Sequence, residues 1–370
     1  MVGFADDNLH VTSGQGSRGL NPKAYGVVGG AALASGLIIH LDDIRGYSPL
    51  TGDNDDFMSF DTIRDVNETD QWLVGTNGVD ELVKWTGTGV ATNLITDFPA
   101  GVTSLTAKQL LQFKSHVHLF DVSENGNRYP TRVRWSNTAL PADYINGNAS
   151  FQDLVGNDWI KQAVLLGPDT VVVLKSKSIW IGYATEDTDV FKYEIQIPGL
   201  GAMAGRTAQA VKGSILFLGW DDVYMFSGTN YVSIGKPIRT ELFRGFNISQ
   251  VDRAFGMVVD DDNEYWLFCP MNNSDYCNTA FVYNYEIGQW VGRHEFTLPI
   301  SSTVEYQNQS STTVGDLVGT IGEQSWKFGD KIGFLGAPIA MLGDNDGYVY
   351  QYDMNLYNDD PGHRDIIIDG

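Results

Sequence analysis

The acidic pair Asp221-Asp222 lies in the stretch GSILFLGWDDVYMFSG, residues 213–228. Two carboxylates can carry out acid–base chemistry when one of them is buried and keeps its proton. Here the pair falls between an apolar run and an alternating run that includes Tyr224, where a hairpin must reverse. Aspartate favours such turns because its side chain bonds the local backbone. We therefore expect a structural turn whose two carboxylates point apart into water, and no catalytic pair.

A second acidic stretch, GDNDGYVYQYD, places Asp344 and Asp346 in an order that partly resembles a calcium-binding loop. The glutamate that closes such a loop is missing, because tyrosine and glutamine stand in its place. A hairpin turn is the preferred interpretation. Asp344 and Asp346 are kept as minor calcium candidates.

Two pairs of residues with alternate spacing are expected to share a strand face: His116 with His118, and Arg132 with Arg134. The histidines would need a third, distant ligand to hold a metal, so solvated or core-edge positions are favoured. The arginines are expected to pair with acidic residues within or between subunits. A phosphate-facing site is the alternative.

The sequence contains no nucleophile elbow, no His-Glu-x-x-His zinc motif and no phosphate-binding loop. It therefore predicts no enzyme and no cofactor. Cys269 and Cys277 are its only cysteines, and free thiols are favoured over a local bridge. No signal peptide pattern opens the chain, and no window approaches the about 18 apolar residues of a membrane span. We expect a soluble protein without a membrane span.

The charge balance is strongly acidic, with 24 Lys and Arg against 46 Asp and Glu and a net charge of −22. Such a surface repels phosphate backbones, which argues against a general nucleic-acid-binding protein. The same repulsion would suit a protein past which DNA slides without sticking.

The elements that must position these residues form a repeated unit of two alternating strands around a Gly, Asn or Asp turn. The unit recurs at 71–87, 110–126, 163–184, 213–228, 263–293 and 337–353. Its onsets lie about 50 residues apart on average, which is typical of one four-stranded blade per interval. The pattern predicts an all-β fold, a β-propeller of about six or seven blades, with small extensions at the N-terminus and in inserted loops. A two-domain β-sandwich is the alternative.

Residues 1–65 match the repeat least and are expected to be an N-terminal extension or an unrecognised first blade. Residues 66–357 are assigned to the propeller and residues 358–370 to a C-terminal tail. The insert near 301–330 is expected to be a long loop. The best helical candidates are short: LTAKQLLQF (105–113) and PIRTELFRGF (237–246).

Three segments together resemble β-propeller proteins of tailed-phage tails. RVRWSNTALPADYI (132–145) is similar to their Arg-x-x-Trp-Ser segment followed by Pro-x-x-Tyr/Trp. Residues 198–243 resemble a core block with Gly-x-x-Ala-x-Arg-Thr, a Gly-x-Asp-Asp-Val-Tyr turn and a closing Ile-Gly. Residues 263–290 resemble a Tyr-Trp strand followed by a Tyr-Asn-x-x-x-Gly-x-Trp hairpin. The residues that carry the resemblance are Arg134, Trp135, Arg206, Asp221, Asp222, Tyr224, Trp266 and Trp290.

The resemblance, which covers roughly residues 130–295, implies a virion structural protein, a tail hub or nozzle. Proteins of this kind form a homo-oligomer, a hexameric ring, below the portal and the tail adaptor, and carry tail fibres or spikes. Genomic DNA passes through the ring during ejection without specific binding. The expected location is the virion tail, assembled in the host cytoplasm. The resemblance does not distinguish between a nozzle, a minimal hub and a neck protein.

A second function class follows from the predicted architecture alone. Propellers place polar loops around a central funnel, and Trp and Tyr suit stacking against sugar rings. The alternative is therefore a propeller-fold glycan-binding lectin or glycan-active enzyme, which predicts a monomer with a carboxylate cluster in its funnel.

Overall fold

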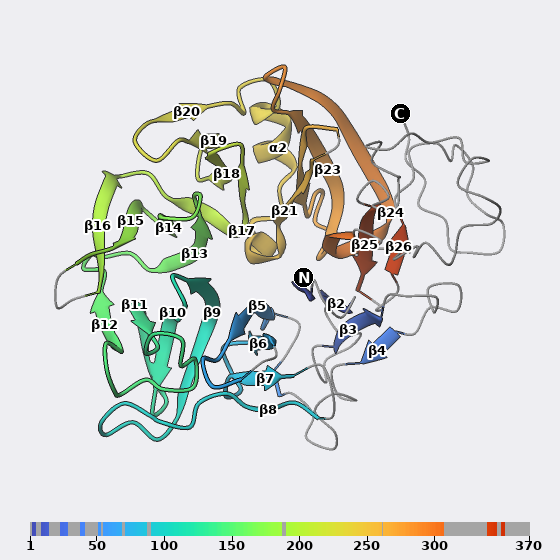
Figure 1. Ribbon diagram of the computed structural model, residues 1–370. Coiled ribbons are helices and arrows are strands. Elements are labelled where there is room, and N and C mark those ends of the chain that lie inside the picture. The colour runs from blue at the N-terminus through green and yellow to red at the C-terminus, as the bar shows by residue number, and fades with distance from the viewer. Residues whose placement is uncertain are drawn as a thin grey trace, which may run out of the picture.

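The computed structural model describes residues 51–306, apart from 53–54, 69–70, 87–89, 187–189 and 261. It also describes strands within 2–4, 9–14, 23–28 and 38–40, and residues 339–345 and 349–351. The described chain forms antiparallel sheets arranged around a centre (Figure 1). The all-β propeller predicted from the repeats is confirmed, and the β-sandwich alternative is wrong. Among the described residues, no helix is long and apolar enough to cross a membrane.

Five sheets form the blades, each an antiparallel meander in chain order. Blade one contains β5 (Ser59–Arg64), β6 (Gln71–Thr76), β7 (Val83–Trp85) and β8 (Thr92–Asn93). Blade two contains β9 (Leu105–Phe113), β10 (His116–Glu124), β11 (Asn127–Trp135) and β12 (Ser150–Asp153). Blade three contains β13 (Ile160–Leu165), β14 (Val171–Lys175), β15 (Ser178–Ala184) and β16 (Phe191–Pro198). Blade four contains β17 (Ala202–Val211), β18 (Ser214–Gly219), β19 (Val223–Phe226) and β20 (Tyr231–Ser233). Blade five begins with β21 (Phe255–Val259), β22 (Glu264–Cys269), β23 (Cys277–Asn284) and the long β24 (Gln289–Tyr306).

The first strand of each blade lies innermost, so β5, β9, β13, β17 and β21 surround the centre (Figure 1). Neighbouring inner strands approach closely at glycines. A Cβ on Gly205 of β17 would lie 2.2 Å from the carbonyl oxygen of Lys161 on β13. A Cβ on Gly256 of β21 would lie 2.6 Å from the carbonyl oxygen of Thr207 on β17. Only glycine allows this spacing, because any side chain would push the blades apart.

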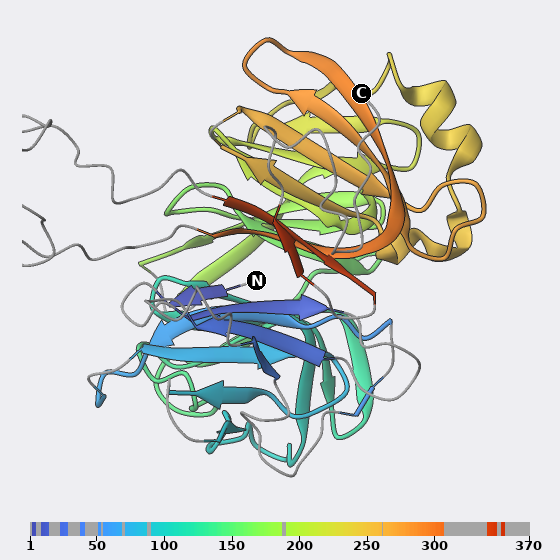
Figure 2. The same ribbon diagram turned by 90° about the vertical axis from the view of Figure 1, so that its right-hand side faces the viewer.

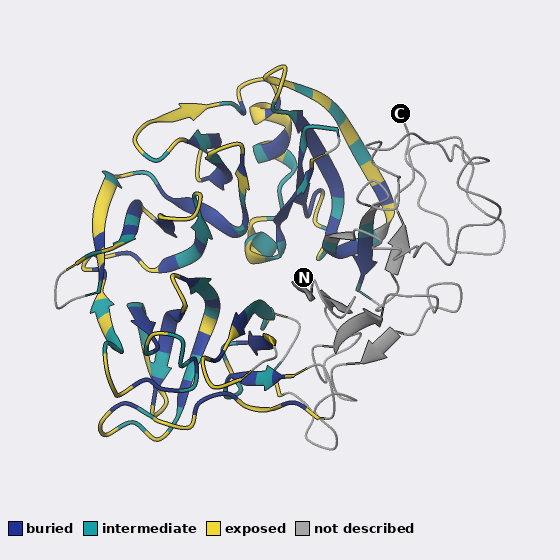
Figure 3. Cartoon of the chain, viewed as in Figure 1, coloured by how far each residue is buried: buried dark blue, intermediate teal, exposed yellow. Residues whose placement is uncertain are grey.

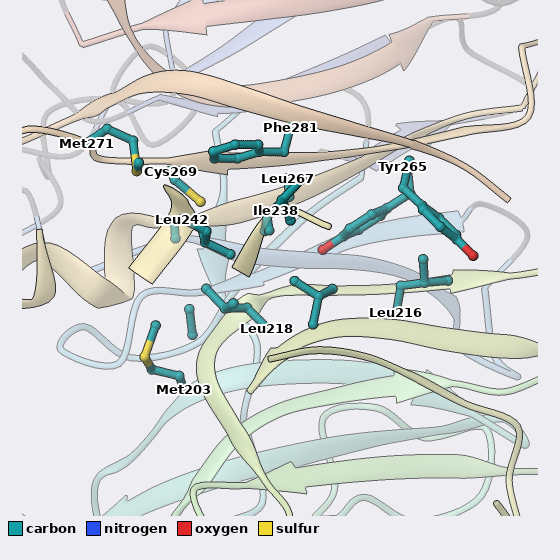
Figure 4. Close-up of a cluster of buried hydrophobic side chains, with 14 of the residues drawn as sticks. Met203, Leu216, Leu218, Ile238, Leu242, Tyr265, Leu267, Cys269, Met271 and Phe281 are labelled. Carbon is teal, nitrogen blue, oxygen red and sulfur yellow. The ribbon is translucent and has the colours of Figure 1, made fainter. Parts of the chain in front are cut away.

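The hydrophobic core lies between neighbouring blades. Among the described residues, four clusters each join residues of two adjacent sheets, and a fifth packs blade five against the second half of β24 and β25. Figure 4 shows the cluster between blades four and five, where Leu216 and Leu218 face Leu267 and Phe281. Strands with both faces covered read as continuous apolar runs, such as the VVVLK of β14, which is buried throughout.

The two helical candidates have different outcomes. Residues 237–246 contain the helix α2 (Arg239–Gly245), which lies on one face of the propeller (Figure 2) and is followed by the 3-10 helix η2 (Ile248–Arg253). Residues 105–113, the other helical candidate, form the strand β9. Leu105 and Ala107 are both buried at alternate positions, so the period-two component of that pattern decides the element.

The expected count of six or seven blades is wrong, because the part of the chain that the structure describes shows five. The sixth repeat, at 337–353, corresponds to β25 (Ile339–Asp344) and β26 (Val349–Gln351). These strands do not form a blade of their own. They add to the fifth sheet, because the second half of β24 pairs with β25 from Ile300 to Tyr306.

A further antiparallel sheet forms from β1 (Val2–Phe4), β2 (Leu9–Gly14), β3 (Lys23–Val28) and β4 (Ile38–His40). It lies between β24–β26 and blade one, since β2 contacts β24 and β1 contacts β5 (Figure 1). Blade one itself begins before residue 66, at Ser59 of β5. The assignment of residues 1–65 and 358–370 to separate segments stays a prediction.

Candidate functional site

The residues that carry the resemblance to phage-tail propellers do not converge on one site. Arg134 and Trp135 lie in blade two, Arg206 in blade four together with the turn and strand that hold Asp221, Asp222 and Tyr224, and Trp266 and Trp290 in blade five. Except for Arg206, their hydrogen bonds are made within a blade or to the segment that joins two blades. They therefore act as internal supports of the fold.

In blade two, the arginines pair with acidic residues, which is the interpretation favoured from the sequence. Nε and Nη2 of Arg134 both donate to Oε1 of Glu124, at 2.9 and 2.6 Å. Arg132 donates to both Glu124 and Asp153. Beside them, the buried Trp135 donates from Nε1 to the carbonyl oxygen of Asn148 at 3.0 Å. No phosphate-facing arginine pair results, because both guanidinium groups already have carboxylate partners.

The turn at Asp221-Asp222 joins β18 to β19, as predicted, but its second carboxylate does not face water. Asp222 is fully buried. Its carboxylate accepts hydrogen bonds from the backbone nitrogen of Val223, the hydroxyl of Ser233 and the guanidinium of Arg239. Asp221 is exposed and accepts a hydrogen bond from Tyr224 Oη at 2.7 Å. The expectation that both acids point into water was wrong, because α2 supplies an arginine from beyond the hairpin.

The two tryptophans of blade five support different contacts. Trp266 is buried and stacks on His294, with ring centroids 4.8 Å apart and an interplanar angle of 7°. Trp290 donates from Nε1 to the carbonyl oxygen of Ile234 at 2.8 Å, which ties the outer strand of blade five to the end of blade four. Trp266 is buried, so its ring offers no surface on which a sugar could stack.

The histidines of β10 belong to an aromatic cluster between blades two and three. His118 is fully buried, and its Nδ1 lies 2.8 Å from Tyr193 Oη. Its ring packs edge-on against Phe191, and His116 packs against the same phenylalanine. Burial, reinforced by the charge of His116, holds the pKa of His118 well below its usual value. Among the residues that the structure describes, no group of three His, Cys, Asp or Glu could hold a metal.

This lowered pKa predicts a pH-dependent stability. The unfolded chain takes up a proton at His118 near pH 6.5, whereas the folded chain does so only at lower pH. The free energy of unfolding should therefore fall as the pH drops below 6.5, by at most about 1.4 kcal/mol per pH unit. Urea unfolding between pH 7 and pH 5 should show a shallower fall in His118→Phe than in the native chain. Parallel profiles for the two proteins would rule out His118 as the source.

Cys269 and Cys277 are buried, free thiols, as favoured from the sequence. Burial raises the pKa of Cys277 to about 12 and that of Cys269 well above its usual value, so neither is a nucleophile in the folded chain. Of the calcium candidates, Asp344 is buried at the end of β25, and Asp346 lies outside the described residues. Calcium binding there stays a prediction.

A central cavity of about 1020 Å³ lies among the described residues, where the predicted architecture places a funnel. Its walls are the inner strands β5, β9, β13, β17 and β21, with η2 and residues 55–58 contributing as well. No local motif marks this cavity, because each blade supplies only a few residues to it. The charged residues that line it are Asp55, Asp56, Lys108, Asp121, Arg128, Lys161, Arg206, Asp252 and Arg253.

Of the eight residues named as carrying the phage-tail resemblance, Arg206 is the one that lines the cavity. Its guanidinium carbon lies 4.0 Å from the ring centroid of Phe57 and 5.4 Å from that of Phe255. Nη2 donates to the carbonyl oxygen of Ser301 at 3.2 Å, whereas Nη1 is buried and has no acceptor among the described residues. Burial lowers the pKa of Arg206 to about 10, although the group stays positively charged near neutral pH.

The chain matches no protein-family model and no curated protein sequence. Among solved structures, it is similar to the WD40 domain of Toxoplasma gondii coronin, with 11% identity over 93% of this chain and 85% of that chain and a TM-score of 0.44. It is similar to Kluyvelomyces marxianus Hsv2, with 8% identity over 82% and 74% and a TM-score of 0.40. It is also similar to BBS1N, solved in complex with ARL6DN, with 13% identity over 79% and 78% and a TM-score of 0.41. Likenesses this distant carry no functional argument, and the chain is placed by its own sheets as a β-propeller.

Proposed function

We propose that the chain is a virion structural protein of a tailed phage, a subunit of the tail hub or nozzle ring through which the genome is ejected. The observation that carries the proposal is the group of residues that resemble phage-tail propellers. Most of them brace the blades, as Arg134 does with Glu124 and Asp222 does with Arg239. The resemblance therefore lies in residues that hold the blades together. Proteins whose role is structural are expected to share such residues.

The outer edges of the blades supply a surface for ring contacts. β16 and β20 are the last strands of their sheets and are largely exposed (Figure 3). Ile195, Tyr231 and Val232 present large apolar side chains there. An exposed edge strand with apolar side chains favours pairing with another chain. A closed homo-oligomer, which we propose to be a hexamer, would cover these edges.

The remaining assignments belong to the same proposal. The ring would bind the tail adaptor and portal assembly on one side and tail fibres or spikes on its outer surface. Genomic DNA would pass through the ring without specific binding, because a chain with a net charge of −22 repels phosphates. If the rate of genome ejection is unchanged when the acidic residues of the ring lumen are neutralised, this electrostatic role is ruled out.

Light scattering on purified protein tests the ring contact. We expect Val232→Asp to lower the fraction of rings, because a carboxylate on the outer edge of β20 would be desolvated in the contact. Val232 is 55% exposed, so the substitution should not unfold the monomer. Val155→Asp is the matched control, since Val155 is 81% exposed but lies in a loop between β12 and β13. Equal ring fractions in Val232→Asp and the native chain would exclude the edge of β20 from the contact.

One observation favours the glycan-binding alternative enough to test it. Trp159 and Trp220 are 44% and 49% exposed. Both contact Ser176: its backbone nitrogen donates to the carbonyl oxygen of Trp159 at 2.9 Å, and its carbonyl oxygen accepts from Trp220 Nε1 at 2.7 Å. The backbone of Trp159 and the indole of Trp220 therefore meet at one turn, and exposed indoles suit stacking on a sugar. Glycan-array binding that is lost in Trp220→Ala, by a chain that stays monomeric, would favour a lectin over the ring.

A further inference from the structure

The central cavity differs in charge from the rest of the molecule. The whole chain carries almost two acidic residues for each basic one, with 46 Asp and Glu against 24 Lys and Arg. Five basic and four acidic side chains line the cavity, so basic residues are concentrated there. An acidic protein with a locally basic interior repels most anions at its surface but can hold one inside.

Three of the five cations are already paired with acids of the same cavity. Arg128 pairs with Asp121, Lys161 pairs with Asp252 at 2.7 Å, and Arg253 pairs with Asp55 at 2.9 Å. Within each pair the two charges neutralise each other, so these three cations are not available to a charged ligand. Within the described part of the chain, Lys108 and Arg206 form no ion pair.

Arg206 has the properties of a ligand-binding cation. Its guanidinium is held against Phe57 and Phe255, so its position is set by packing. A guanidinium has five N–H donors, and here only Ser301 supplies an acceptor among the described residues. Arg206 is partly buried and its Nη1 has no acceptor among the described residues, which is costly for a cation, and a bound oxyanion offsets that cost.

Lys108 provides a second, independent charge from another blade. It lies on β9, two strands around the ring from β17, and its side chain is exposed at the cavity wall. A cavity of about 1020 Å³ is large enough for a small organic molecule that spans part of the distance between the two strands.

We propose that the central cavity binds a small molecule that carries a phosphate or carboxylate group, with Arg206 as its principal cation and Lys108 as a second. Arginine matches the geometry of either oxyanion, because its donors form a planar fork. The site is separate from the outer edges of the blades, so the proposal does not depend on ring formation.

Binding of inorganic phosphate and of citrate to the full chain tests the proposal, measured by isothermal titration calorimetry at constant ionic strength against chloride. The variants are Arg206→Gln and Lys108→Gln. Lys236→Gln is the matched control, since Lys236 is an exposed lysine outside the cavity wall. We expect Arg206→Gln to weaken the binding of the preferred anion at least about tenfold, the loss expected from a charge-assisted hydrogen bond. Lys108→Gln should weaken it about threefold to tenfold, and Lys236→Gln should leave it unchanged.

Tighter binding of phosphate identifies a phosphate-bearing ligand, and tighter binding of citrate identifies a carboxylate. Circular dichroism checks that Arg206→Gln is folded; if it is not, the comparison of Lys108→Gln with Lys236→Gln decides. The proposal is overturned if the native chain binds neither anion above the chloride background, or if the folded variants all bind as the native chain does.

Discussion

Replacing Lys175 with methionine should lower the free energy of unfolding by about 3–5 kcal/mol, the cost of leaving a buried charge without its partner. Lys175 ends β14 and is 0% exposed. Its Nζ lies 2.7 Å from Oδ1 of Asp158 and donates to the carbonyl oxygen of Leu154 at 2.7 Å. Asp158 is also buried and accepts a hydrogen bond from Ser178. The network therefore ties the loop after blade two to two strands of blade three.

Urea unfolding of four variants, each compared with the native chain, measures this effect. Lys175→Met and Asp158→Asn should each be destabilised, and the double variant should be less destabilised than the sum, because neither charge is then left alone. Lys192→Met removes a lysine from an exposed pair with Glu194 and should change the free energy of unfolding by less than about 1 kcal/mol. A loss below about 1 kcal/mol in Lys175→Met would show that the buried pair does not support blade three.

Replacing Asp222 with alanine should lower the free energy of unfolding by about 3 kcal/mol. The buried carboxylate accepts hydrogen bonds from Val223, Ser233 and Arg239, and bonds to a charged group contribute about 1.5–3 kcal/mol each. Arg239 keeps part of its hydration when the carboxylate is removed, because its side chain is half exposed. The remaining hydration limits the loss of unfolding free energy, which should therefore be smaller in Asp222→Ala than in Lys175→Met.

The adjacent acid is the natural control. Asp221 is exposed and bonds only Tyr224 among the hydrogen bonds of the described residues, so Asp221→Ala should cost less than about 1.5 kcal/mol. Thermal and urea unfolding of the two single variants separates the roles of two neighbouring, chemically identical residues. Equal losses in both would mean that Asp222 supports nothing beyond its own turn.

The hairpins of the fold could be predicted from sequence because their signal is local. Residues 71–87 and 213–228 alternate in hydrophobicity around a turn, and both form the expected strand pairs. The blade count could not be predicted in the same way. The hairpin at 337–353 has the same local pattern as a blade, and only its pairing with β24 makes it part of the fifth sheet.

The candidate site was harder to predict because its contacts are distant in sequence. The partner of Asp222 is Arg239, which lies 17 positions away on a helix, so the turn alone suggested exposure to water. The cavity takes Lys108, Lys161 and Arg206 from three blades. The sequence signal for the cavity was a single basic residue on each of several apolar strands of an acidic chain. The alternation of apolar and polar residues does not show, however, that these strands are the innermost strands of their blades.

The position of the chain in purified phage particles tests the central claim most directly. Particles would be labelled with a gold-tagged antibody against the chain and viewed by electron microscopy, with the copy number measured by quantitative mass spectrometry. The tail-ring account predicts gold at the tail end of the particle and about six copies of the 40.8-kDa chain per particle. A chain that is abundant in the lysate but absent from purified particles would contradict it.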